Sequence, residues 1–232
     1  MLHKEDRSTQ ARGVDRRAGT NALGRAVPLL GDSGVHCLSE CRYRSFAELA
    51  DARVEGVDYE ITARRNAASS TAVVVPHGGR IEEGTSEFAR RIAGEDLNLY
   101  LFEGLQPTGS LRSLHLTSHL FDEPRCLGLL SQCDHVVALH GCRGDRPAAF
   151  LGGLDAMLKQ AVARAFAAAG IEVHLEGHRY PGVHPRNICN RGRRGLGVQI
   201  EMTSALRLGH RTEELAVALR GALLALSDPI RG

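Results

Sequence analysis

Short apolar runs alternate with amphipathic stretches from residue 71 onward. The β-branched run 72–75 is bounded by Pro76 and two glycines, which predicts a buried strand. Similar runs predict further strands over 97–102, 114–117, 135–139, 171–175 and 197–202. In the last of these, apolar side chains alternate with Gln199 and Glu201, which therefore share one face.

Helical patterns lie between these runs. The clearest helix covers 154–169, where apolar residues recur at helical spacing until Gly170. Thr85 is expected to cap a helix over 86–93, Pro124 to begin one that reaches about residue 132, and Thr212 to cap a final leucine-striped helix. A short helix is expected near Phe46. This order favours an α/β fold with a mixed, mostly parallel sheet flanked by helices.

The first part of the chain has a different composition. Residues 1–30 hold six Lys or Arg against three Asp or Glu and show no sustained apolar period. We therefore expect a flexible basic tail over residues 1–41. The remainder, residues 42–230, is expected to form one folded domain, since the 232-residue chain is near the upper size for a single core.

Composition excludes several classes of protein. The formal net charge of +2 is too balanced for a dedicated nucleic-acid binder, and the longest apolar runs are too short to span a bilayer. The start lacks the apolar centre of a secretory signal, and six cysteines are too few for a disulfide framework. We expect a monomeric cytoplasmic protein with reduced thiols.

Polar residues able to bind a metal follow three of the predicted strands. His77, His140 and Glu201 each come at the end of an apolar run, and Glu82 follows His77 after a glycine pair. Ligands bind outside the carboxyl ends of strands in open α/β sheets, and two histidines with a glutamate are a common catalytic zinc set. A lone histidine at such a place is more often structural. Composition and spacing therefore support both interpretations about equally.

Eight motifs follow one another along residues 42–207: PHGGRIEEGTSE at 76–87, YLFEG at 100–104, HLTS at 115–118, FDEP at 121–124, HGC at 140–142, GGLD at 152–155, NICNRG at 187–192 and GVQIE at 197–201. In this order they resemble the poly-γ-glutamate hydrolase family of phages and bacteria. The resemblance implies a metallocarboxypeptidase-like fold. It also implies zinc (Zn²⁺) ligands at His77, Glu82 and His140, with Glu201 as the catalytic carboxylate.

These expectations define a zinc-dependent hydrolase of γ-glutamyl amide bonds, in which Glu201 is the general base for a zinc-activated water. Its partner would be an anionic γ-glutamyl polymer or oligopeptide. Guanidinium groups pair well with carboxylates, so Arg191 is the leading substrate-binding candidate, together with Asn190 and Asn187. His115 and Ser118 lie in a matched motif, and we expect them to make structural hydrogen bonds.

Three alternatives stay open. The chain could be another metal-dependent amide hydrolase, carboxypeptidase-like or acting on N-acyl amino acids. Cys142, two residues after His140, could act as a thiol nucleophile, although a small buried cysteine is the commoner case. A phage-related, nucleic-acid-associated protein that uses its basic tail is the non-enzymatic alternative.

Overall fold

The computed structural model describes residues 42–227, and the predicted basic tail over 1–41 lies outside these described residues. The strands are β1 (Tyr59–Arg64), β2 (Thr71–Gly79), β3 (Asn98–Gly104), β4 (His135–Cys142), β5 (Ala148–Gly152), β6 (Glu172–His174) and β7 (Val198–Thr203). The helices are α1 (Phe46–Ala52), α2 (Thr85–Ala93), α3 (Ser110–Leu114), α4 (Pro124–Leu130), α5 (Ala156–Ala168), α6 (Ser204–Arg207), α7 (Thr212–Ser227) and the 3-10 turn η1 (Ile188–Asn190). None of the helices described is long and apolar enough to cross a membrane.

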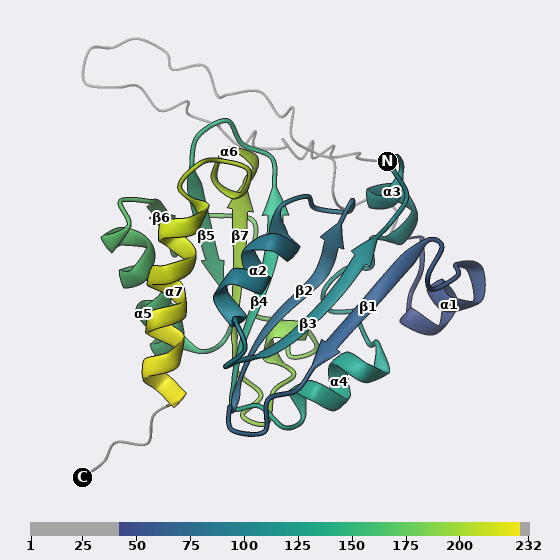
Figure 1. The fold of residues 1–232 in the computed structure, drawn as a ribbon, viewed down its shortest axis with the longest axis horizontal. Helices are drawn as coiled ribbons and strands as arrows, with labels where there is room; N and C mark the ends of the chain where they lie inside the picture. The colour runs from purple at the N-terminus through teal and green to yellow at the C-terminus, as the bar shows by residue number, and fades with distance from the viewer. Residues whose placement is uncertain (1–41, 228–232) are drawn as a thin grey trace, which may run out of the picture. The chain divides into compact units, whose positions relative to one another are not determined.

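The strands form one mixed sheet in the order β1-β3-β2-β4-β7-β5-β6 (Figure 1). Strands β3, β2, β4 and β7 are neighbours that run parallel. Strand β1 pairs antiparallel with β3, and β5 pairs antiparallel with β7. The predicted mixed, mostly parallel sheet with flanking helices is therefore confirmed.

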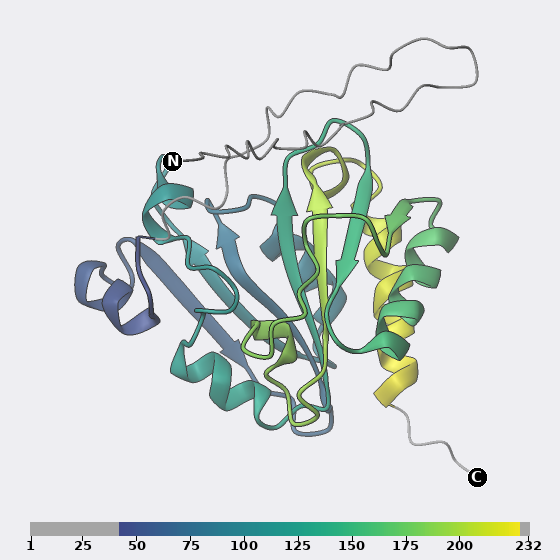
Figure 2. The same cartoon turned by 180° about the vertical axis from the view of Figure 1, so that it is seen from behind.

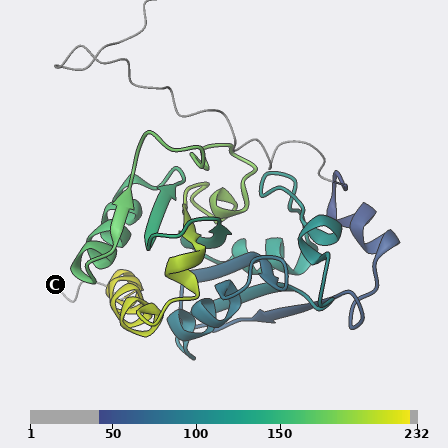
Figure 3. The ribbon, with the colours of Figure 1, turned by 90° about the horizontal axis from the view of Figure 1, so that it is seen from above.

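Each face of the sheet packs on its own apolar cluster. Helices α2, α5 and α7 cover one face (Figures 1 and 3), while α4 and η1 lie on the other (Figure 2). Alternation along β2 divides its side chains accordingly: Val73 and Val75 join the cluster under the three helices, and Ala72 and Val74 join the opposite cluster. The near-continuous apolar run of this strand reflects burial on both faces.

The predicted helices form. Helix α4 begins at Pro124 as expected, while Thr212 is the first residue of α7 rather than its cap. Helix α5 begins two residues later than expected because Asp155 caps it, accepting a hydrogen bond from the Leu158 main-chain N–H. The prediction that Thr85 caps α2 is wrong. Gly84 takes that place with φ of +88°, a conformation that favours glycine, and Thr85 is the first helical residue.

Other local predictions are also corrected. The expected strand over 114–117 is absent; the chain forms helix α3 and then an irregular segment that buries Leu114 and Leu116 in one cluster. Strands β1 and β5 were not expected. The first lies at a sheet edge with irregular burial, and the second is short and alanine-rich, so neither carries a strong strand pattern.

We expect Asp155→Ala to lower the free energy of unfolding by about 1–2 kcal/mol, because it removes the cap of α5. The buried Asp155 carboxylate also pairs with Arg194 at 2.8 Å. Asp155→Asn keeps the cap acceptor but loses the charge, so it should cost less. Urea unfolding of both variants checks this expectation, and equal stability of Asp155→Ala and the parent would contradict it.

Candidate metal centre

The candidate centre lies at the carboxyl ends of three adjacent parallel strands. His140 on β4 and Glu201 on β7 are register partners, so their side chains emerge side by side on one face. Val198, Ile200 and Met202 of β7 pack on the opposite face, under the helices. The predicted division of β7 into an apolar and a polar face is therefore observed.

His77 reaches the same face because β2 is irregular. Val75 pairs with Leu101 but Gly78 pairs with Glu103, so β2 holds one residue more than β3 over this stretch. Strict alternation would place His77 on the helix side with Val75; the extra residue turns it toward His140 instead. Gly78 takes the helix side, where a Cβ atom would lie only 2.3 Å from the Ser86 hydroxyl on α2.

A tight loop after β2 brings Glu82 back to His77. The Glu82 main-chain N–H donates to the carbonyl of His77 at 2.9 Å, and Gly79 turns the chain with φ of +59°. The Thr85 hydroxyl donates to the Glu82 carbonyl at 2.7 Å. One carboxylate oxygen, Oε2, then accepts from the Gly141 main-chain N–H at 2.7 Å.

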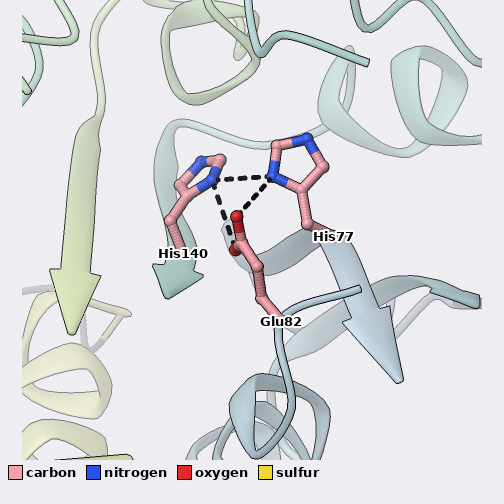
Figure 4. A group of neighbouring side chains, drawn as sticks. All are labelled: His77, Glu82 and His140. Atoms are coloured by element: carbon pink, nitrogen blue, oxygen red, sulfur yellow. Dashed lines mark hydrogen bonds and ion pairs between the residues drawn. The ribbon is translucent and has the colours of Figure 1, made fainter. Parts of the chain in front are cut away.

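Three side chains consequently meet in one place (Figure 4). Nδ1 of His77 lies 3.1 Å from Nδ1 of His140 and 3.3 Å from Oε1 of Glu82. Oε2 of Glu82 lies 3.9 Å from Nδ1 of His140. Among residues 42–227 these are the His, Cys, Asp and Glu side chains that gather closely enough to hold a metal ion.

The segment after α3 orients both imidazoles. Nε2 of His77 lies 2.9 Å from the carbonyl oxygen of Leu116, which can only accept a hydrogen bond. This contact places the proton on Nε2 of the neutral ring and leaves Nδ1 as a metal donor. Nε2 of His140 lies 3.4 Å from the hydroxyl of Ser118, and His115 stacks on His77 with ring centroids 4.2 Å apart. The contact of Ser118 agrees with the hydrogen-bonding role expected for it, while the contact shown for His115 is ring stacking.

Burial and neighbouring charges shift the pKa values of the groups in the centre. Burial lowers the pKa of His115 to about 3 and, together with His77, holds the pKa of His140 well below its usual range. Burial also acts to lower the pKa of His77, but the Glu82 carboxylate and the hydrogen bond to the Leu116 carbonyl together raise it above its ordinary value. Burial and the Glu82 charge raise the pKa of Glu201. Two buried carboxylates that disfavour each other's charge are suited to a bound cation.

The predicted substrate residues lie on and beside η1, and Asn187 contacts β7 through Gln199. Asn187 caps η1 and donates to Gln199, while Asn190 donates to the carbonyl oxygens of Gly182 and His184 and accepts from Leu154. Both asparagine side chains are buried.

Arg191 follows η1 and is half-buried. Its charge acts on the Cys126 thiol of α4. No contact described for residues 42–227 joins Arg191 to the three clustered side chains.

Two contacts of the centre were not expected from the sequence. Gln199 donates to Glu201, and its place two residues earlier on the same strand face was a signal that could have been used. The Gly141 main-chain N–H has no sequence signature. The thiol alternative loses support, because burial and the Glu201 charge raise the pKa of Cys142 to about 11, and a reactive thiol needs a lowered pKa.

Several known proteins are similar to this chain in sequence or in fold. The family model for poly-gamma-glutamate hydrolase matches residues 43–213. The UPF0714 proteins YndL and YmaC of Bacillus subtilis (strain 168) are 36% and 34% identical over 167 residues. Each alignment covers 71% of this chain, and the chain spans 65% of the length of YndL and 70% of that of YmaC.

Two solved structures have the same architecture. A bacteriophage poly-gamma-glutamate hydrolase matches with a TM-score of 0.75 and 32% identity, covering 79% of this chain and 97% of that one. A zinc-free apo structure of YndL matches with a TM-score of 0.74 and 31% identity, covering 80% of this chain and 98% of that one. The chain belongs to the poly-gamma-glutamate hydrolase family, which is a family of hydrolases.

Proposed function

We propose that this protein is a zinc-dependent hydrolase of γ-glutamyl amide bonds in poly-γ-glutamate. The observation that carries the proposal is the convergence of His77, Glu82 and His140 at the sheet edge, with Glu201 on the adjacent strand. The family match and the bacteriophage enzyme of the same fold support the choice of substrate. Another metal-dependent amide hydrolase is the alternative outcome of the tests below.

Zinc suits these three donors. Zinc–nitrogen bonds of about 2.0–2.1 Å in a tetrahedral site place neighbouring ligand atoms roughly 3.3 Å apart. The separations of Nδ1 of His77 from Nδ1 of His140 and from Oε1 of Glu82, 3.1 and 3.3 Å, agree with this value. The 3.9 Å distance from His140 is to the other oxygen of Glu82, Oε2, which also accepts from Gly141. A structure of the relative YndL is described as zinc-free, which favours zinc here too.

The chain's own residues would handle the proton and hold the reacting groups. When bound, zinc supplies Lewis-acid activation of water and of the amide carbonyl. Glu201 accepts the proton of the attacking water, and the amide C–N bond breaks as Glu201 returns that proton to the leaving nitrogen. Because burial and the Glu82 charge raise the pKa of Glu201, its carboxylate is a stronger base than an exposed one.

The polymer carries one free carboxylate on every residue, so its recognition requires cations or hydrogen-bond donors. Arg191 is our candidate for binding such a carboxylate, since it is a half-buried residue with a guanidinium group at the end of η1. Direct substrate contacts by Asn190 and Asn187 stay predictions. A monomeric state and a cytoplasmic location also stay predictions from the sequence.

Purified protein should release short γ-glutamyl fragments from poly-γ-glutamate. A chelator should abolish the release and added zinc should restore it, because the proposed chemistry needs the ion. Gel filtration of the polymer and an assay of new amino groups measure this. Poly-α-glutamate of equal length is the control; equal cleavage of both polymers, or cleavage of small N-acyl amino acids alone, would contradict the proposed substrate.

We expect the parent protein to hold about one zinc ion per chain, as a three-ligand catalytic site does. The variants His77→Ala and His140→Ala should each lose most of that zinc. Metal analysis after dialysis measures the loss, with circular dichroism as the check on folding. His174→Ala is the matched control, since that partly exposed histidine pairs with Glu172 on edge strand β6. Unchanged zinc in both alanine variants would show that the ion binds elsewhere.

Glu201→Gln should fold normally and keep zinc, since the two side chains have nearly the same shape. Turnover should fall by about 100- to 10,000-fold, because an amide cannot accept the water proton. Single-turnover kinetics and metal analysis separate the possible results. Loss of zinc would make Glu201 a ligand rather than the base, and full activity would exclude the mechanism.

A further inference from the structure

Gln199 stands between the catalytic carboxylate and the η1 loop. Its Nε2 donates to Oε1 of Glu201 at 3.2 Å, and its Oε1 accepts from Nδ2 of Asn187 at 2.7 Å. Gln199 and Asn187 are each 6% exposed, so their amides depend largely on hydrogen bonds within the protein.

The orientation of the Asn187 and Gln199 side-chain amides is determined by the main-chain N–H of Cys189. Oδ1 of Asn187 accepts from the main-chain N–H of Cys189 at 3.1 Å. Because a main-chain N–H can only donate, the oxygen of Asn187 must face it, and the NH₂ group must face Gln199. The oxygen of Gln199 then faces Asn187, and its NH₂ group faces Glu201. One orientation of both amides satisfies all three hydrogen bonds.

This row of hydrogen bonds has a consequence for Glu201. A donor on Oε1 fixes the carboxylate plane and leaves Oε2 as the acceptor for another proton. A general base has to be correctly aimed before it can accept a proton.

We propose that Asn187 and Gln199 are positioning residues, which aim and stabilise the Glu201 carboxylate through a hydrogen-bond relay from the Cys189 main-chain N–H. The inference rests on the proposed function, since it gives the relay the task of serving the general base. It gives Asn187 an indirect role through Gln199, as the alternative to the predicted contact with substrate.

Asn187→Asp tests the direction of the relay. An aspartate still accepts from Cys189 but cannot donate, so the Gln199 amide must rotate and turn its oxygen toward Glu201. We expect kcat to fall about 10- to 100-fold, the effect of losing a hydrogen bond to a charged group, with KM and zinc content unchanged. Gln199→Met, which has similar length and no amide, should give a comparable loss.

The double variant distinguishes a relay from two separate effects. If Asn187 acts through Gln199, adding Asn187→Asp to Gln199→Met should lower kcat no further. In the metal-free protein, the side-chain amide NMR signals of Gln199, assigned by their loss in Gln199→Met, should shift in Asn187→Asp. Asn98→Asp is the control for placing a buried charge, because Asn98 donates to the Ser69 and Thr71 carbonyls at the start of β3. It should lower stability without changing kcat.

Several results would overturn the relay. One is an unchanged kcat in both single variants, and another is a double variant in which the two losses of kcat add. A third is a raised KM at constant kcat in Asn187→Asp, which would indicate direct substrate contact by Asn187. If Asn187→Asp does not fold, the kcat of Gln199→Met tests the relay instead. If Glu201→Gln is inactive while these variants are normal, the relay alone fails. If the parent does not cleave poly-γ-glutamate, the proposed function fails instead.

Discussion

The parallel pairing of β2, β4 and β7 is the constraint on which the candidate centre depends. Hydrogen bonds between β4 and β7 place His140 opposite Glu201, and a slip of one residue would turn one of them toward the helix-covered core. The apolar residues of β7 under α2, α5 and α7 oppose such a slip, because it would expose them to the polar face. Core packing on one side of the sheet therefore maintains the geometry of the polar cluster on the other.

The cluster collects ionisable groups where water is scarce. His77 and His140 are 1% and 2% exposed, and Glu82 and Glu201 are 9% and 8% exposed. Burying such groups without partners is costly, so each has a hydrogen bond or ion pair from the surrounding chain. Main-chain groups supply two of these contacts, the carbonyl of Leu116 to His77 and the N–H of Gly141 to Glu82. Donors arranged in this way are preorganised for a cation.

Segments distant in sequence contribute to one carboxylate. Glu201 has His140 beside it on β4, Gln199 on its own strand, and Asn187 behind Gln199 from the η1 loop. On the sheet's other face, helices α2, α5 and α7 pack without contributing side chains to the three-residue cluster of His77, Glu82 and His140. The fold thus separates stability and proposed chemistry between its two faces, although the strands are common to both.

The sequence by itself determined the α/β class and most strands and helices, and it singled out His77, Glu82, His140 and Glu201 as candidate site residues. It could do so because the period of apolar residues reports burial directly, and because metal-competent side chains followed three apolar runs within recognisable motifs. Tertiary structure alone decided the strand order, the irregularity that turns His77 onto the polar face, and the direction of the Asn187–Gln199 amides. These features depend on pairing between distant segments and on main-chain donors and acceptors, which every residue carries and no residue type reveals.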